Sequence, residues 1–388
     1  MKSRLLKLGT AALLGLALAA GAQAHGVTDK EIVLGTHLDL SGPVAASMPD
    51  LRNGMQMRID EVNEAGGING RKIRMVVEDN ASQPQLAVRV TEKLLRSDDV
   101  FAIVNPFGSG TNVASIKKAV DAGVLYFSPW GASAIFQKVG GNNPLLFTTV
   151  PNYDIVLHKS VDWMIKKYGA KKVGFIYQEG PMGDLMGAGV KAAMQDNKMT
   201  LVAEAAYKVG DIDFSSQVAR MKAAGTDLIV AASLTRETIG IMSEVKKLGW
   251  ADVRVLTGTS GRTGVVLSLG KESVEGLYGA GPWIVGTEHP AVQAWKARYK
   301  KRFNNLEPDE NAVLAYDNTD WLLKAIETVG KDVTVEKVAK ALQSSTYDDK
   351  GRVLLTPVRF VNNHISPESV VIDQVQKGKW TTVSDVFK

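Results

Sequence analysis

Apolar runs typical of buried strands alternate with helix-period segments along almost the whole chain. The first unit is a strand at residues 32–36, a helix at about 49–64 and a second strand at 72–78. Further strand-type runs follow at residues 101–104, 124–127, 172–177, 201–207, 227–232, 254–257 and 276–280. Helix-period segments between them lie at residues 85–96, 113–122, 155–168, 215–224 and 237–248. Such alternation predicts an α/β protein with parallel sheets covered by helices on both faces.

The strands and helices form two successive blocks. The first block ends near Phe147 and the second begins near Tyr153, with residues 148–152 between them. After about Gly281 the pattern changes to long helices at residues 291–303, 310–329 and 335–342, followed by a tail of short strands. A chain of 388 residues is too long for one hydrophobic core, so we expect two lobes.

The first 24 residues have the pattern of an export signal. Lys2, Arg4 and Lys7 precede an apolar run at residues 8–20, and a small-x-small cleavage site ends at Ala24. The apolar run of 13 residues is shorter than the roughly 20 residues that span a bilayer, which argues against a membrane anchor. We therefore expect cleavage after Ala24 and a periplasmic protein.

Composition narrows the class of protein further. The sequence contains no cysteine, so it predicts neither a lipid-modified cysteine nor a disulfide. Removing the three basic residues of the signal lowers the formal net charge from +5 to +2, and no long basic block remains. Binding of nucleic acid is therefore not expected. No second run is apolar and long enough to cross a membrane.

Two stretches resemble the leucine/isoleucine/valine-binding family of bacterial solute receptors. The first reads LDLSGPVA and then GMQMRIDEVNEAGGINGRKI within residues 38–73, and the second reads DFSSQVARMK at residues 213–222. Members of this family deliver solutes to ABC importers and have the type I periplasmic binding-protein fold. The resemblance therefore implies two doubly wound parallel-sheet lobes that close around a ligand.

The family fold also implies that the chain crosses the hinge between the lobes three times. We expect these crossings at residues 148–152, 280–282 and 354–357. With the signal at residues 1–24, the first lobe would comprise residues 25–149 and 281–355. The second lobe would comprise residues 150–280 and 356–388.

Ligands of open α/β sheets lie beyond the carboxyl ends of the strands, where helix N-termini offer free N–H groups. The loops expected there are residues 37–43, 105–111, 128–133, 178–184, 233–236 and 257–262. In the family, two of these loops bind a carboxylate through hydroxyls and backbone amides. The resemblance thus assigns ligand contacts in the first lobe to Phe107, Gly108, Ser109, Gly110, Trp130, Gly131 and Ala132. Ordinary helix capping explains the same residues equally simply.

This sequence departs from the amino-acid receptors at several of these positions. The family serine of the first loop falls on Gly108 and the family threonine of the second loop on Ala132. In the second lobe, the acid that binds the α-ammonium falls on Ser260, and aromatic positions fall near Met182 and Leu234. Loss of that acid favours an organic or aromatic acid without an α-amine over a branched-chain or other amino acid.

Charged residues in the cleft loops leave alternatives open. Glu179, Asp184 or Asp39 can replace the missing acid, although each is also explained as a helix-start residue. Arg236 and Arg262 can clamp a carboxylate, and we include Arg262 among the ligand contacts. Their simpler role is an ion pair. Aromatic rings that can stack on the ligand occur at Phe107, Trp130, Tyr177 and Trp283, and Trp130 lies next to the anion loop.

Motifs of enzymes and metal sites are absent from the sequence. It contains no Gly-x-Gly-x-x-Gly series after the first strand, no phosphate loop and no Gly-x-Ser-x-Gly elbow, because Arg262 replaces the last glycine after Ser260. The five histidines form no short-spaced pair. We predict no catalysis, no metal and no cofactor. The expected partners are a small-molecule ligand and an inner-membrane ABC permease, with a monomeric protein, and a ligand-sensing receptor domain is the alternative.

Overall fold

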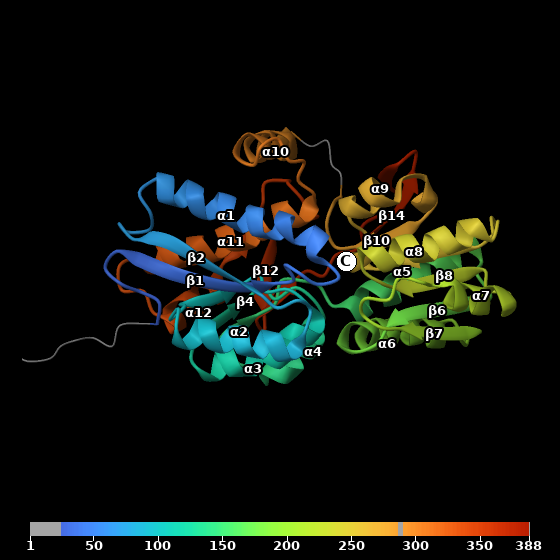
Figure 1. Ribbon diagram of the computed structural model, residues 1–388, viewed down its shortest axis with the longest axis horizontal. Coiled ribbons are helices and arrows are strands. Elements are labelled where there is room, and N and C mark those ends of the chain that lie inside the picture. The colour runs from blue at the N-terminus through green and yellow to red at the C-terminus, as the bar shows by residue number, and fades with distance from the viewer. Residues whose placement is uncertain (1–24, 286–289, 388) are drawn as a thin grey trace, which may run out of the picture.

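The structure is a computed structural model that describes residues 25–285 and 290–387. Two lobes lie side by side along the long axis of the molecule (Figure 1). The predicted export signal at residues 1–24 lies outside the described residues. Within the described part of the chain, every helix is too short or too polar to cross a membrane.

The first lobe contains a five-stranded parallel sheet with the order β2-β1-β3-β4-β5. Its strands are β1 (Glu31–Leu38), β2 (Lys72–Asp79), β3 (Ala102–Val104), β4 (Leu125–Phe127) and β5 (Leu146–Phe147). Its helices are α1 (Met48–Glu64), α2 (Pro84–Arg96), α3 (Ser109–Asp121), α4 (Ser133–Gly140), α10 (Pro290–Arg302), α11 (Glu310–Val329) and α12 (Val335–Ser344). A small antiparallel sheet of β11 (Thr346–Tyr347), β12 (Val358–Val361) and β13 (His364–Ser366) completes this lobe.

Helices cover both faces of the first sheet, and successive side chains of a strand point to opposite faces. Ile32 and Leu34 pack with residues of α1, α11 and α12, whereas Val33 packs with residues of α2, α3 and α4. A strand that is covered on both faces is apolar at most of its positions. This composition explains why the strands were recognisable as apolar runs.

The second lobe contains a seven-stranded sheet with the order β15-β14-β10-β9-β8-β6-β7. Its strands are β6 (Val173–Gln178), β7 (Ala203–Tyr207), β8 (Leu228–Ala232), β9 (Arg254–Thr257), β10 (Tyr278–Gly281), β14 (Val371–Gln376) and β15 (Lys379–Thr382). Its helices are α5 (Tyr153–Tyr168), α6 (Pro181–Asp196), α7 (Ser215–Ala223), α8 (Thr235–Lys247) and α9 (Gly264–Gly270). The strands are parallel except at β14 and β15, which add an antiparallel edge to the sheet. The predicted α/β class with two sheet-based lobes is confirmed.

The chain passes from one sheet to the other after β5, after β10 and before β14. The third of these passages is not at residues 354–357, where we expected it. Phe360 of β12 stacks on Trp321 of α11 with ring centroids 4.2 Å apart, and it meets Phe147 of β5 edge-on. Residues 356–366 therefore pack in the first lobe, and the chain enters the second sheet only at β14. Pro357 precedes a strand and does not mark a crossing.

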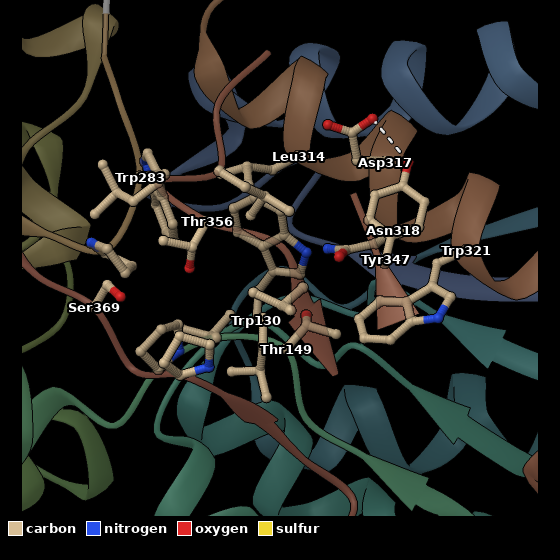
Figure 2. Close-up of a pocket in the computed structure, with 18 residues that line it drawn as sticks. Trp130, Thr149, Trp283, Leu314, Asp317, Asn318, Trp321, Tyr347, Thr356 and Ser369 are labelled. Atoms are coloured by element: carbon tan, nitrogen blue, oxygen red, sulfur yellow. Dashed lines mark hydrogen bonds between the residues drawn. The ribbon is translucent and has the colours of Figure 1, made fainter. Parts of the chain in front are cut away.

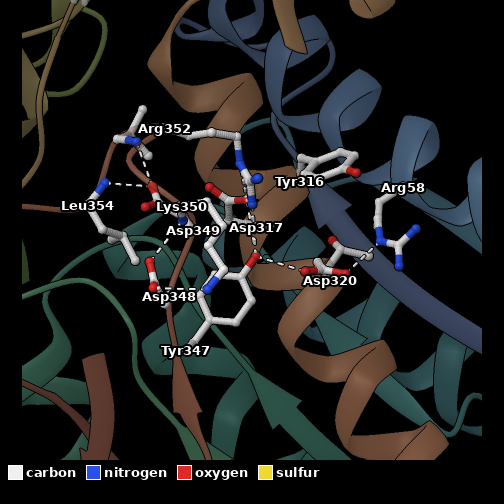
Figure 3. A network of polar contacts seen from close by, with 12 residues as sticks. Arg58, Tyr316, Asp317, Asp320, Tyr347, Asp348, Asp349, Lys350, Arg352 and Leu354 are labelled. Carbon is white, nitrogen blue, oxygen red and sulfur yellow. Dashed lines mark hydrogen bonds and ion pairs between the residues drawn. The ribbon is translucent and has the colours of Figure 1, made fainter. Parts of the chain in front are cut away.

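A polar network also holds the segment around β11 to the first lobe (Figure 3). The Tyr347 hydroxyl lies 3.1 Å from Asp317 Oδ1 and 2.9 Å from Asp320 Oδ2, both on α11. Arg352 forms an ion pair with Asp317, and Arg58 of α1 forms one with Asp320 at 2.7 Å. Burial raises the pKa of Asp317 to about 7, against the opposing effect of Arg352. These contacts explain why the chain beyond α12 stays on the first lobe.

The crossing segments enclose a small cavity of about 30 Å³ behind the interlobe cleft. Trp130 and Trp283 form part of its wall, together with Thr149 and Ser369 near two crossings and Thr356 of the first lobe (Figure 2). The same two tryptophans also line the larger cavity in the cleft. They therefore separate the hinge from the cleft.

Candidate functional site

A cavity of about 400 Å³ lies between the two lobes. Its walls come from loops at the carboxyl ends of strands in both sheets and from the first turns of the helices that follow. The amino ends of α1, α3, α6 and α8 all reach it. Helix amino ends present unpaired N–H groups and a positive dipole end, so this arrangement suits an anionic group.

Nine of the residues that were predicted from the sequence line this cavity. They are Phe107, Gly108, Ser109, Gly110, Trp130, Gly131, Met182, Leu234 and Ser260. Other lining residues lie outside the loops predicted from the sequence, and they include Val44, Met48, Leu51, Tyr153, Thr263 and Asn311. Tyr153 is the first residue of α5, directly after the first crossing. A helix start next to a hinge segment was the available signal for it.

The two predicted anion loops of the first lobe are bonded to each other. Gly108 N–H donates to the Trp130 carbonyl at 3.0 Å, and Trp130 N–H donates to the Pro106 carbonyl at 2.8 Å. Ala132 N–H donates to Ser109 Oγ at 3.1 Å, so Ala132 acts behind the cavity wall and is not one of its lining residues. Because Ser109 Oγ accepts this bond, its own hydroxyl hydrogen remains available for a ligand.

Glycine is required at position 108 by both conformation and space. Its φ is 106°, in a region that side chains rarely adopt, and an added Cβ would lie 2.5 Å from Thr111 Oγ1. We expect Gly108→Ala to lower the free energy of unfolding by about 1–3 kcal/mol, measured by urea denaturation.

Gly110→Ala is the matched control for that variant. Gly110 is not among the glycines with positive φ, and an added Cβ there would have only Pro84 Cγ nearby, at 3.6 Å. This control should remain within about 0.5 kcal/mol of the parent protein. Equal stability of Gly108→Ala and Gly110→Ala would show that the loop tolerates a different backbone.

Apolar side chains make up most of the remaining wall. Phe107, Trp130, Tyr153 and Trp283 contribute rings, and Met182 and Leu234 contribute aliphatic surface from the second lobe. The Trp130 indole N–H donates to Asn105 Oδ1 at 3.1 Å, which fixes the ring and leaves its apolar face for packing. Tyr177, the other aromatic residue considered, is not a lining residue and stacks on Phe175 instead.

Few charged groups reach the cavity. Among the described lining residues none is basic, and Glu179 is the only acid. Asp184 is exposed and lies outside the lining. Asp39 is fully buried, where its carboxylate accepts hydrogen bonds from Gly42 N–H, Val44 N–H and the Ser82 hydroxyl. Of the three acids proposed to replace the ammonium-binding residue, only Glu179 can meet a ligand in this structure.

Arg262 does not line the cavity, in contrast to our expectation. Its guanidinium is 1% exposed and donates to Asp373 Oδ2 from both Nε and Nη2, at 2.8 and 2.6 Å. Nη2 also donates to the Trp283 carbonyl at 2.7 Å. Arg262 thus forms a buried ion pair that supports the cleft wall from behind.

The other predicted charged and polar groups have structural contacts too. Arg236 donates from Nη2 to the Pro43 carbonyl at 2.8 Å, which joins the second lobe to the first at the cleft mouth. Ser260 Oγ donates to the Ser233 carbonyl at 3.0 Å. His37 is buried between Tyr126 and Asn80, and burial lowers its pKa to about 3. Among the described residues, no cluster of three His, Asp or Glu side chains is arranged to hold a metal ion.

The sequence profile of the periplasmic binding proteins matches residues 31–379. The chain therefore belongs to this family, whose members are solute-binding proteins of ABC transporters and not a class of enzymes. It is 23% identical to Leu/Ile/Val-binding protein homolog 8 of Brucella suis over 98% of this chain and 96% of the relative.

Solved structures show the same type I fold. A fatty acid ABC transporter substrate-binding protein from Thermomonospora curvata superposes with a TM-score of 0.84 at 26% identity, covering 94% of each chain. An ABC transporter solute-binding protein from R. palustris in complex with benzoate superposes with a TM-score of 0.81 at 20% identity, covering 91% of this chain and 95% of the other. The match to the family model thus confirms the family that the stretches within residues 38–73 and at 213–222 resemble.

Proposed function

We propose that this protein captures an organic or aromatic acid without an α-amine between its lobes and delivers it to an inner-membrane ABC permease. In this proposal the protein acts in the periplasm as a monomer, after cleavage behind Ala24. Residues 25–149 and 281–366 would form the first lobe, and residues 150–280 and 367–388 the second.

The observation that carries the proposal is the chemistry of the cavity wall. Apolar side chains surround most of the space, and helix amino ends with Ser109 offer donors at one side. Ser260 stands where the amino-acid receptors have the acid for the ammonium. An ammonium without such a partner loses a charge-assisted hydrogen bond worth roughly 1.5–3 kcal/mol, or about one to two decades of affinity. The names of the fatty acid and benzoate receptors agree with this proposal, whereas the name of the Leu/Ile/Val-binding relative agrees with an amino acid.

A thermal-shift screen of the mature protein tests this function. The panel would contain amino acids, aromatic acids, short-chain acids and their amides. A ligand at 100 times its dissociation constant stabilises by about 2.7 kcal/mol, which is a readily measured shift. We expect stabilisation by acids and not by the matching amides, together with compaction in X-ray scattering. Substrate turnover without ligand-dependent compaction would contradict a solute-binding role.

An amino acid is the second candidate ligand, because Glu179 lines the cavity. The variant Glu179→Gln separates the two candidates. If the ligand is an acid without an amine, its affinity should stay within about threefold of the parent or rise, since a nearby negative charge is removed. If the ligand is an amino acid, we expect a loss of about one to two decades. Isothermal titration calorimetry of both proteins measures the difference.

A further inference from the structure

Glu310 connects the two lobes beside the cavity. It is the first residue of α11 in the first lobe, and Gly264 is the first residue of α9 in the second lobe. Gly264 N–H donates to both carboxyl oxygens of Glu310, at 3.1 and 3.2 Å. The Glu310 side chain therefore binds the amino end of a helix in the opposite lobe.

This interlobe contact is directly adjacent to the ligand cavity. Thr263 and Asn311, the chain neighbours of Gly264 and Glu310, both line the cavity. The approach of α9 is close, because a Cβ added to Gly264 would lie 3.2 Å from Asp309 Cβ and 3.4 Å from Glu310 Oε2. Glu310 is only 5% exposed, and separation of the lobes would withdraw Gly264 from it and open its carboxyl group to water.

Three carboxyl groups gather at this point, from Asp50 of α1, Asp309 and Glu310. In the described part of the chain none of them has an ion-pair partner at contact distance. Tyr299 of α10 contacts Asp50 at 3.3 Å, Lys296 of α10 is paired with Glu307, and Arg262 acts on Glu310 only through space. Burial raises the pKa of Glu310 to about 7, although the Glu310 and Gly264 N–H groups and Arg262 act to lower it. Burial also raises the pKa of Asp50 to about 6 and raises that of Asp309.

We propose that Glu310 is a positioning residue that couples closure of the lobes to uptake of a proton. The proposal rests on the proposed solute-binding function, since closure is the step that traps the solute. When α9 withdraws, Glu310 loses both its burial and the Gly264 N–H donor. Burial has the larger effect on this carboxyl group, so its pKa falls toward the ordinary value near 4.5. The closed state then holds more protons than the open state. Closure is therefore favoured at acidic pH, and this advantage is lost as the pH rises through about 7.

Fluorescence energy transfer between the lobes tests the proposal without any ligand. The chain has no cysteine, so dyes can be attached to cysteines introduced at the exposed positions Ser97 and Ala223, one in each lobe. In the parent protein we expect the ratio of closed to open molecules to rise by up to about tenfold per pH unit for one proton, between pH 7 and 5. Glu310→Gln keeps an oxygen acceptor for Gly264 but cannot take up a proton. Its closed-to-open ratio should therefore depend on pH less steeply than that of the parent protein, by about one proton.

Two control variants separate coupling from mere structural support. Arg236→Ala removes a different interlobe contact, to the Pro43 carbonyl. It should therefore favour open molecules at every pH and leave the pH dependence of the closed-to-open ratio unchanged. Glu272→Gln removes an exposed acid and should change neither the closed-to-open ratio nor its dependence on pH. A flat profile in the parent protein, or an unchanged slope in Glu310→Gln, overturns the proposal. Failure of the proposed function would instead appear as no stabilisation by any acid in the thermal-shift panel.

Discussion

Ser109→Glu is expected to abolish binding of a carboxylate ligand while the protein stays folded. Ser109 lines the cavity at the first position of α3, where an acidic side chain is compatible with the helix dipole. The new carboxylate would occupy the place of the ligand's anion, and a like-charge contact of this kind costs several kcal/mol. We expect at least about a 100-fold loss of affinity, measured by calorimetry with an acid that stabilises the parent protein.

Ser109→Ala is the control for the charge. It removes the acceptor for Ala132 N–H and the hydroxyl offered to the ligand, but adds no charge. A hydroxyl that donates to a carboxylate makes a charge-assisted hydrogen bond worth about 1.5–3 kcal/mol, so we expect a loss of about one to two decades of affinity, smaller than that of Ser109→Glu. Undiminished affinity in Ser109→Glu would show that this loop only caps α3 and that the anion binds elsewhere.

Arg262→Met is expected to cause the largest loss of stability. Arg262 and Asp373 are 1% and 2% exposed, so the substitution leaves a buried carboxylate without its partner. Removing one member of a buried pair costs about 3–5 kcal/mol. The Trp283 carbonyl also loses its donor, so ligand affinity should fall with stability. Urea denaturation of the mature protein measures the change in the free energy of unfolding.

The double variant Arg262→Met with Asp373→Leu separates loss of the pair from loss of packing. With both charges gone no unpaired group remains, and such replacements are often neutral or stabilising. We expect the double variant to recover most of the stability that Arg262→Met loses. If the two substitutions instead add independently, the ion pair is not what makes Arg262 important.

The fold was largely predictable because its signals are local. Strands covered on both faces are mostly apolar, so β8 appears as an unbroken apolar run and β1 and β6 appear as largely apolar runs between helix-period segments. The third hinge passage was not predictable in this way. Its position depends on Phe360 packing against Trp321 and Phe147, which are distant in sequence. From the local sequence, a proline such as Pro357 looks the same whether it precedes a strand or lies at a hinge crossing.

The candidate site was predictable to the extent that it consists of loops after strands. Gly108, Ser109 and Gly131 follow β3 and β4 directly, and the carboxyl ends of neighbouring parallel strands lie at one edge of a sheet. The role of Arg262 was not predictable, because its partner Asp373 is 111 residues away. Likewise, the local bonds that occupy Asp39 become visible only in three dimensions.

Calorimetry with matched ligand pairs tests the central claim most directly. Leucine would be compared with 4-methylpentanoate, and phenylalanine with phenylpropanoate, on the mature protein. Each pair differs only in the α-amine, so the comparison isolates the missing partner for an ammonium. We expect the better-fitting deaminated acid to bind at least about tenfold more tightly than its amino acid. Micromolar binding of the amino acids with no binding of their deaminated partners would contradict the claim.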